Sequence, residues 1–216
     1  MRPAWLSPAL LRRLLLLLFG IFLPLLLAGE IAEELLARER FAFEQPLMLA
    51  VHGHTEGTPW VKVALVLHWL GAWPAASLIA VLIAWYESRQ RRIERAVFVL
   101  TGTALSTAIM TLAKAFFDRP RPELWPRLVE ETSASFPSGH STFAAALAVT
   151  VMVLCWHQPY RWWVVAAATA LALLAGFSRV VLGVHYPTDV LVGWITGMAT
   201  ALGVHQVMRG RWLAFR

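Results

Sequence analysis

Residues 178–189 contain an arginine, a histidine and an aspartate between two apolar runs, residues 162–177 and 190–204. The three are Arg179, His185 and Asp189. If the apolar runs cross a membrane, each charged residue costs roughly 2.5–3.5 kcal/mol at the bilayer centre and less near its surface. Such residues usually mark a transport pathway or a reaction site.

The spacing of His185 and Asp189 suits acid–base or nucleophilic chemistry. Pro187 lacks an N–H group and favours the first turn of a helix, which puts His185 in the loop before that helix and Asp189 in its first turn. A carboxylate there can accept one imidazole N–H and set the tautomer that a nucleophilic or general-base histidine needs. The alternative is an aspartate that only complements the helix dipole, beside a histidine at the membrane surface.

The composition indicates a membrane protein of one domain. Of 216 residues, 58% are apolar and 15% are charged, against about 45–50% and about 25% in soluble domains. The net charge of +6 comes from cations scattered between apolar runs, which argues against nucleic-acid binding and favours a role in membrane topology. A single cysteine, Cys155, permits neither an intrachain disulfide nor a thiolate metal cluster.

Six apolar runs predict an all-α fold with six membrane-spanning helices, most of them near the ~20 residues that a bilayer requires. Pro74 should kink the second run. Residues 30–58, after the first run, are polar and acidic with apolar residues at helical spacing, which predicts an extra amphipathic helix outside the membrane. The first run resembles a signal peptide but has a poor cleavage site, so we expect a retained span. The six runs are residues 14–29, 63–86, 96–113, 141–156, 162–177 and 190–204.

The single domain divides into residues 1–57, the first span with the amphipathic segment, and residues 58–216, a core of five membrane helices. Lysine and arginine are in excess on the side of the two termini, which predicts that both termini are cytoplasmic. The bias becomes clear once Lys114, Arg121 and Arg179 are set aside as site residues. The cations on the cytoplasmic side are Arg2, Arg12, Arg13, Arg89, Arg91, Arg92, Arg95, Arg161, Arg209, Arg211 and Arg216.

In this topology three polar clusters open on the opposite face of the membrane. Lys114, Arg121 and Arg179 supply three cations, and the guanidinium fork suits phosphate oxygens. Ser138 and Gly139 precede the fourth apolar run, so backbone N–H groups at a helix start can face an anion, and glycine allows close approach. Taken singly, Lys114 could be a snorkelling end residue, and the prolines beside Arg121 could form an ordinary rigid loop.

Two histidines flank this anion-binding cradle. His185 can attack phosphorus and His140 can protonate the leaving oxygen, while fixed cations neutralise charge in place of Mg²⁺. The sequence has neither a carboxylate cluster for Mg²⁺ nor an HExxH pair for Zn²⁺. We interpret His52 and His54, a weak metal pair, as part of a solvated loop, and His68 as a hydrogen-bonded packing histidine.

The clusters resemble the three-part signature of the type 2 phosphatidic acid phosphatase family, which shares a core with vanadium haloperoxidases and bacterial class A acid phosphatases. The signature reads Lys-x6-Arg-Pro, Pro-Ser-Gly-His and Ser-Arg-x5-His-x3-Asp. The resemblance covers roughly spans two to six. The matching residues are Lys114-x6-Arg121-Pro122, Pro137-Ser138-Gly139-His140 and Ser178-Arg179-x5-His185-x3-Asp189.

This resemblance implies a metal-independent phosphatase that needs no cofactor and forms a phosphohistidine on His185. Asp189 would orient that histidine, and His140 would act as general acid and then as the base that activates water. The implied substrates are lipid phosphates or diphosphates at the outer face of the bacterial cytoplasmic membrane: phosphatidic acid, phosphatidylglycerophosphate, diacylglycerol diphosphate, undecaprenyl diphosphate or lipid A. The phosphoryl group would be held by Lys114, Arg121, Ser138, Gly139 and Arg179.

Other interpretations of the same residues stay open. A lipid phosphotransferase would pass the phosphoryl group to another lipid, a haloperoxidase would bind vanadate, and a transporter or scaffold would carry an inactive site. We interpret Trp125, in the proline-stiffened loop 119–135, as part of a lid that contacts lipid, with a simple membrane anchor as the alternative. Gly193 and Gly197 predict close packing of the last span against a helix of this or another chain.

Overall fold

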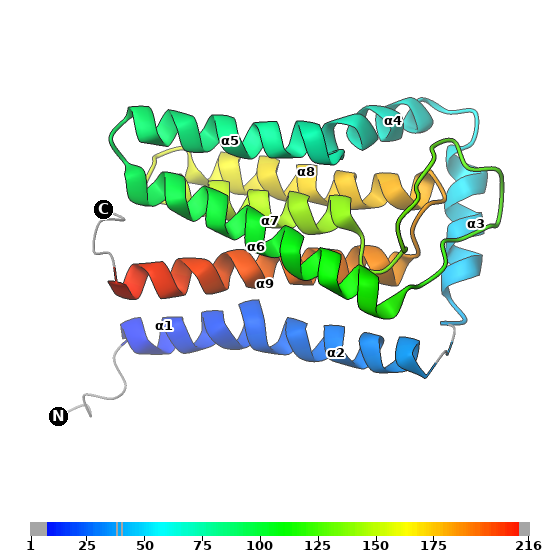
Figure 1. Cartoon of the computed structure of the whole chain (residues 1–216), viewed down its shortest axis with the longest axis horizontal. Helices are drawn as coiled ribbons and strands as arrows, with labels where there is room; N and C mark the ends of the chain where they lie inside the picture. Colours follow the sequence, from blue (N-terminus) through cyan, green and yellow to red (C-terminus); the bar gives the residue numbers. More distant parts are fainter. Residues whose placement is uncertain (1–7, 38, 40, 212–216) are drawn as a thin grey trace.

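The computed structural model describes residues 8–211 apart from residues 38 and 40, and this part of the chain contains helices and no strand. Most helices run along one long axis, and α3 crosses the bundle at one end (Figure 1). Arg2 and Arg216, which entered the charge bias, lie outside the described residues. The helices are α1 (Pro8–Leu17), a π-helical turn (Leu18–Phe22), α2 (Leu23–Leu36), α3 (Glu44–Thr55), α4 (Pro59–Gly71), α5 (Trp73–Arg89), α6 (Ile93–Phe117), α7 (Gly139–Leu154), α8 (Arg161–Val181) and α9 (Pro187–Arg211).

The described helices make this a multi-pass membrane protein. By length and composition, α4 and α5 together count as a fifth candidate span beside four straight ones, although the pair is bent by 62°. α7 has 16 residues and is shorter than the four. The described chain therefore supports four to five spans by this measure, fewer than the six predicted. The four straight candidates are Leu14–Leu36, Ile93–Phe117, Arg161–Val181 and Pro187–Arg209.

The second predicted span consists of two helices, α4 and α5. Ala72 between them is extended, with φ −61° and ψ 144°, and Pro74 occupies the first turn of α5. Proline lacks the N–H for an i→i−4 hydrogen bond, and it is tolerated in the first turn of a helix, where that bond is not required. The kink predicted at Pro74 is therefore confirmed, in the form of a complete break after Gly71.

The boundaries predicted for the segment after the first span were wrong. α2 runs on through Gly29 to Leu36, because residues 23–36 consist largely of Leu, Ala and Glu, which are strong helix formers. The polar segment then forms a separate helix, α3, whose buried residues are Glu44, Met48 and Thr55. The inner face of α3 is therefore not the purely apolar face expected of a simple amphipathic helix, because it buries the Glu44 carboxylate.

The interpretation of His52 and His54 as a solvated loop was also wrong. Both residues lie on α3, where His54 Nδ1 pairs with the Ala50 carbonyl oxygen at 2.7 Å. His52 Nε2 lies 3.5 Å from a carboxylate oxygen of Glu56. In the described part of the chain, no three His, Cys, Asp or Glu side chains are grouped so that they could hold a metal ion.

α7 is the central helix of the bundle and packs against α6, α8 and α9. Two glycines allow α9 to approach it closely. A Cβ on Gly193 would lie 2.7 Å from the carbonyl oxygen of Ser138, and one on Gly197 would overlap the carbonyl oxygen of Thr142. The glycine pair therefore packs α9 against α7 of the same chain.

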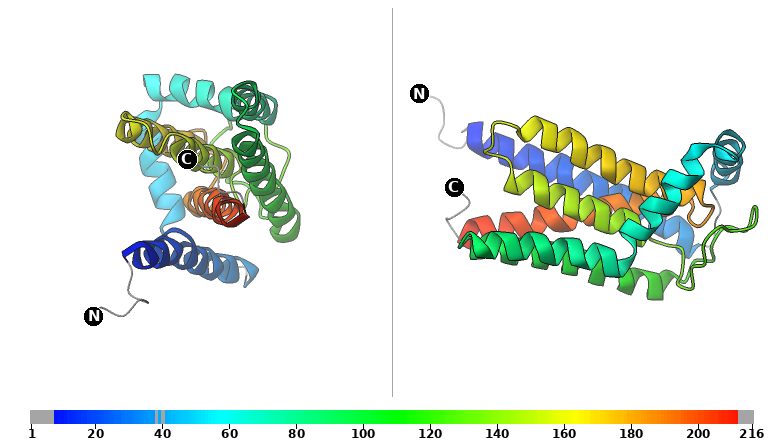
Figure 2. Two further views of the ribbon diagram at one scale, coloured as in Figure 1. Left: turned by 90° about the vertical axis from the view of Figure 1, so that its left-hand side faces the viewer. Right: turned by 90° about the horizontal axis from the view of Figure 1, so that it is seen from above.

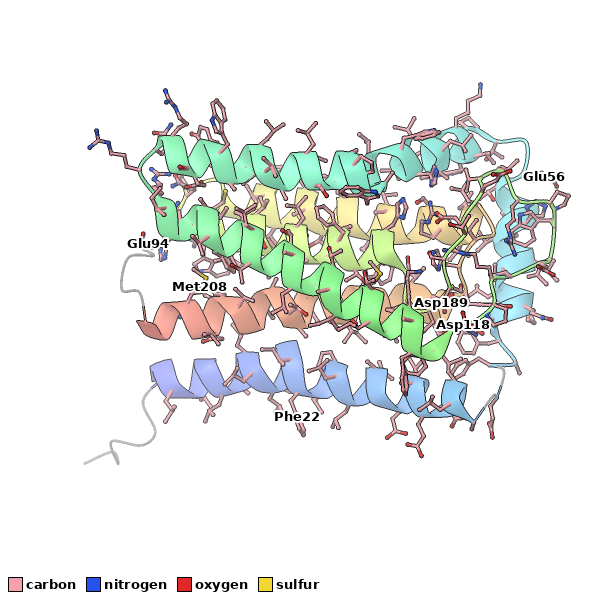
Figure 3. All side chains as sticks on the ribbon, viewed as in Figure 1. Phe22, Glu56, Glu94, Asp118, Asp189 and Met208 are labelled. Atoms are coloured by element: carbon pink, nitrogen blue, oxygen red, sulfur yellow. The ribbon has the colours of Figure 1, made fainter. Side chains whose placement is uncertain are left out.

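The two ends of the bundle differ in their chemistry. Asp118 and Asp189 lie at the end crossed by α3, with the long loop between α6 and α7, whereas Glu94 and Met208 lie at the other end (Figure 3). α1 begins and α9 ends at that other end (Figure 1). Further views place α1 and α2 on the outside of the bundle, beside α9 (Figure 2).

Candidate active site

The three polar clusters of the sequence meet at the end of the bundle that α3 crosses. The first comes from the end of α6 and the loop after it, the second from the start of α7, and the third from the end of α8 and the start of α9. The Ser138 N–H donates to the Asp189 carbonyl oxygen at 2.9 Å, and Arg121 Nη1 donates to the Val184 carbonyl oxygen at 2.9 Å. These bonds join all three clusters into one site.

His185 is buried in the turn between α8 and α9, and its two ring nitrogens face different groups. Nδ1 lies 3.5 Å from Asp189 Oδ2 and 3.4 Å from the hydroxyl of Ser135. The Ser135 hydroxyl donates in turn to Asp189 Oδ2 at 2.5 Å. Nε2 lies 3.2 Å from Arg121 Nη1. The carboxylate side therefore holds Nδ1, and Nε2 is directed to the cations.

Asp189 lies in the first turn of α9, as the sequence predicted, and it has partners that the sequence did not reveal. The Tyr186 N–H donates to Oδ2 at 2.8 Å, and Arg119 Nη1 donates to Oδ1 at 2.6 Å. Arg119 Nη2 also donates to Glu44 at 2.6 Å, while the other Glu44 oxygen accepts from the Thr188 hydroxyl at 2.5 Å. A buried chain of charged groups thus links α3 to the site.

Two of the predicted cations share one carboxylate. Arg179 is fully buried, with Nη1 2.9 Å from His68 Nδ1 and Nη2 donating to Glu131. Arg121 Nη2 lies 3.4 Å from the second oxygen of Glu131. Arg179 Nε is buried and has no acceptor among the described residues. One donor in the middle of the site is therefore still to be satisfied.

The third predicted cation, Lys114, also contacts the loop after α6. Its Nζ donates to the carbonyl oxygen of Ala134. Arg121 Nε donates to the carbonyl oxygen of Ser133 at 2.8 Å. All three cations therefore face the short segment 131–134 of this loop.

The start of α7 supplies backbone donors and the second histidine. Ser138 caps the helix, because its hydroxyl accepts from the Ser141 N–H at 3.4 Å, and Gly139 is the first helical residue. First-turn N–H groups have no acceptor inside the helix and favour an anion. His140 Nε2 donates to the His68 carbonyl oxygen at 3.0 Å, so Nδ1 is the nitrogen left to exchange a proton.

His68 belongs to this site through both its ring and its backbone. Its ring stacks on that of His140, with centroids 5.5 Å apart and an interplanar angle of 13°. Gly71 lies about one turn later on α4, at a position where the Cβ of any other residue would overlap the His140 ring. His68 does pack and hydrogen-bond as predicted, but the sequence did not reveal that it does so inside the site.

Two loop residues of the site differ in ionisation: burial keeps His185 neutral, and neighbouring cations keep Glu131 ionised. Burial lowers the pKa of His185 to about 4, although Asp189 favours the protonated ring. The imidazole is therefore neutral at pH 7, the form that a nucleophile requires. Burial raises the pKa of the Glu131 carboxyl, but Arg179 and Arg121 outweigh it and hold that pKa below its usual value. Glu131 is therefore an anion beside the cations.

Trp125 packs inward in the loop between α6 and α7. Its indole stacks on His52 of α3, with centroids 4.1 Å apart and an interplanar angle of 12°. It covers Gly183, which has φ +70° and where a Cβ would lie 2.7 Å from the indole nitrogen. The neighbouring Leu128 is 54% exposed. Trp125 ties the loop to α3, and its role as a lipid-contacting lid stays a prediction.

Comparison with known proteins identifies the family of this site. The family described as the PAP2 superfamily matches residues 95–213, which is more than half of the chain and includes every motif described above. This chain belongs to the PAP2 superfamily. The resemblance found in the sequence motifs is therefore confirmed.

Several similar proteins of this superfamily are named as lipid phosphatases. Phosphatidylglycerophosphatase B of Bacillus subtilis (strain 168) is 44% identical over 90 residues, 39% of this chain and less than half (44%) of that protein. Undecaprenyl-diphosphatase BcrC of the same organism is 30% identical over 146 residues, 66% of this chain and 72% of that protein. The crystal structure of a transmembrane PAP2 type phosphatidylglycerolphosphate phosphatase from Bacillus subtilis matches with a TM-score of 0.74 and 29% identity, over 89% of this chain and 98% of that one.

Proposed function

We propose that this protein is a lipid phosphatase that transfers the phosphoryl group of its substrate first to His185 and then to water, without a metal ion. The observation that carries the proposal is the position of His185 Nε2, 3.2 Å from Arg121 Nη1 in a buried cluster of cations. A nucleophile directed at an anion-binding cluster is the arrangement that phosphoryl transfer requires. The PAP2 relatives named as phosphatases support the same chemistry.

The cradle binds the phosphoryl group. Arg179 and Arg121 present guanidinium donors to its oxygens, and Lys114 adds a third positive charge. Ser138 and Gly139 contribute the start of α7 and its first-turn N–H groups. A phosphoryl oxygen would also supply an acceptor for the unpaired Nε of Arg179. These charges take the part that Mg²⁺ plays in other phosphoryl-transfer enzymes.

The first chemical step forms a phosphohistidine. The Nε2 lone pair of neutral His185 attacks phosphorus, the bond from phosphorus to the lipid oxygen breaks, and His140 gives a proton to that oxygen. Asp189 accepts a hydrogen bond from Nδ1–H of His185 and stabilises the positive charge that develops on the ring. Ser135 and Arg119 hold this carboxylate in place.

The second step releases phosphate. His140, now neutral, takes a proton from a water molecule, the water oxygen bonds to phosphorus, and the bond between phosphorus and His185 Nε2 breaks. Inorganic phosphate leaves and both histidines return to their starting states. The candidate substrates are undecaprenyl diphosphate, phosphatidic acid and phosphatidylglycerophosphate, all of which carry a terminal phosphate.

The membrane arrangement that we propose has six spans. α7 is the span that we add to the five candidates. Other helices pack around it, so its length need not match the full thickness of the lipid. The end with Arg89, Arg91, Arg92 and Arg95 is cytoplasmic, and both termini share that side. The active site then opens to the outer face of a bacterial cytoplasmic membrane, and α3 lies at that surface.

A phosphate-release assay tests the proposed function. Purified protein in detergent would be given each of the three lipids with EDTA present, alongside the His185→Ala variant. We expect release that survives EDTA and is lost in the variant, because His185 carries the phosphoryl group. Activity that requires an added metal, or that survives the substitution, would overturn the mechanism. A phosphorylated lipid product in place of inorganic phosphate would identify a transferase.

A further inference from the structure

We propose that Glu131 is an internal competitor for the phosphate cradle, which a terminal phosphate displaces and a phosphodiester head group does not. This inference rests on the proposed function and adds a determinant of its specificity. Glu131 lies outside the three sequence motifs of the site. It comes from the loop between α6 and α7, in a stretch without helix or strand.

The contacts of Glu131 reproduce those of a bound anion. One carboxylate oxygen accepts from Arg179 Nη2 and lies 3.8 Å from His68 Nδ1. The other lies 3.4 Å from Arg121 Nη2. A single carboxylate therefore bridges the two guanidinium groups that the proposed mechanism gives to the phosphoryl group.

The rest of the segment 131–134 occupies the remaining cation. The Ala134 carbonyl oxygen accepts from Lys114, and the Ser133 carbonyl oxygen and hydroxyl both accept from Arg121. The segment as a whole thus provides acceptors for every cation of the cradle. A substrate phosphate can contact these cations in the same way only if the Glu131 carboxylate moves aside.

Exposure shows which partner is able to move. The side chain of Arg179 is fully buried, whereas that of Glu131 is 19% exposed and lies at the edge of the site. A displaced Glu131 can turn into solvent and be hydrated, but Arg179 has no such exit. The arginines are therefore the fixed part of the cradle, and the carboxylate is the exchangeable part.

Charge then decides which ligands win the exchange. A carboxylate and a phosphodiester each carry one negative charge, so replacing one with the other gains little Coulomb energy. A terminal phosphate carries close to two charges at pH 7 and three acceptor oxygens, so it forms stronger bidentate contacts with two arginines. Phosphodiester lipids surround a membrane enzyme in large excess. Glu131 would keep them off a cradle whose three cations would otherwise bind them.

Binding measurements on three variants test this inference. Glu131→Gln removes the charge with little change of shape, Glu131→Asp keeps the charge on a shorter side chain, and Glu130→Gln is the control, because Glu130 is the exposed neighbour of Glu131. The affinity for inorganic phosphate would be measured by calorimetry in detergent. Inhibition of lipid phosphate hydrolysis by phosphatidylglycerol, a phosphodiester, would be measured on the same samples.

We expect Glu131→Gln to bind phosphate about tenfold more tightly and phosphatidylglycerol to inhibit it about tenfold more strongly, since loss of one competing charge pair is worth about a factor of ten. Glu130→Gln should match the wild type. Weaker or unchanged phosphate binding in Glu131→Gln would overturn the inference and make Glu131 a support for Arg179. If Glu131→Gln does not fold, Glu131→Asp decides, with tighter binding expected because its carboxylate reaches the arginines less well.

Failure of the proposed function gives a different result. Phosphate binding needs no turnover, so a wild type that binds phosphate but hydrolyses no lipid would refute the phosphatase and still test Glu131. A wild type that hydrolyses lipid, with Glu131→Gln binding phosphate more weakly, would refute only the role of Glu131.

Discussion

At the scale of single residues, His185 is held from one side and exposed to cations from the other. The Asp189 carboxylate and the Ser135 hydroxyl face Nδ1, and the Arg121 guanidinium faces Nε2. The spacing in the sequence was sufficient to pair His185 with Asp189, because Pro187 places the histidine just before a helix and the aspartate in its first turn. It could not reveal Ser135 or Arg119, because both reach Asp189 from an irregular loop whose path has no sequence periodicity.

The buried position of His185 leads to a prediction about pH. Between its folded pKa of about 4 and the ordinary value of 6.5, the unfolded chain binds a proton that the folded protein does not. The stability that this residue contributes is therefore complete above pH 6.5 and falls as the pH drops towards 4. NMR titration of histidine-labelled protein, with His185→Gln to assign the signal, should give an inflection near pH 4. An inflection near 6.5 would show that the ring is not buried in neutral form.

At the scale of elements, the helix positions were largely predictable and their breaks less so. The start of α9 at Pro187 and the break before Pro74 follow from the geometry of proline. The split between α2 and α3 did not appear in the pattern, because Ile31 and Leu35 continue the helical spacing of the first span. The burial of Glu44 was also invisible, since it depends on Arg119, which is distant in the sequence.

Glu44 should therefore matter for both stability and activity. Glu44→Ala leaves Arg119 with Asp189 as its one remaining carboxylate partner among the described residues, and breaking a buried ion pair costs about 3–5 kcal/mol. We expect a lower Tm in detergent and a reduced kcat, because Arg119 no longer holds Asp189 from a fixed position. The control is Glu56→Ala at the C-terminal cap of α3, where the glutamate side chain is 71% exposed. Equal Tm and kcat in the two variants would show that the buried chain of charges has no such role.

The contact between α7 and α9 leads to a second prediction for an element. Gly197→Ala places a methyl group on the carbonyl oxygen of Thr142, and such overpacking costs about 1–3 kcal/mol. Gly203→Ala is the matched control on the same helix, because a Cβ there meets nothing within 4 Å. We expect Gly197→Ala to lower Tm and Gly203→Ala to leave it unchanged or raise it, since alanine favours helices. A lower Tm in both variants would mean that helix packing is not the cause.

At the scale of the whole molecule, all the chemistry described here lies at one end of a helical bundle. Composition and apolar runs were sufficient to predict a helical membrane protein, and the alternation of the predicted spans was sufficient to place the three polar clusters on one face. The number of spans was harder to predict, because the central helix α7 is short and is covered by α6, α8 and α9 rather than by lipid.

The proposed orientation predicts which end of the bundle reagents can reach. Cys155 is the one cysteine of the sequence, so a Cys155→Ala background gives a clean starting point. A cysteine introduced by Glu56→Cys, at the site end, should react with a membrane-impermeant maleimide in intact bacterial cells. One introduced by Gln90→Cys, in the loop before α6, should react only after the cells are permeabilised. The reverse pattern would place the active site in the cytoplasm.

The central claim is that His185 carries the phosphoryl group between the lipid and water. The most direct measurement is a rapid-quench experiment with lipid labelled in its terminal phosphate, stopped in alkali to preserve phosphohistidine, followed by mass spectrometry of the peptides. We predict a transient phosphoryl group on His185 of the wild type and none in His185→Gln. In His140→Ala the phosphoryl group should accumulate where loss of the base slows hydrolysis more than transfer. Hydrolysis at full rate with no label on the protein, or with the label on another residue, would contradict the account.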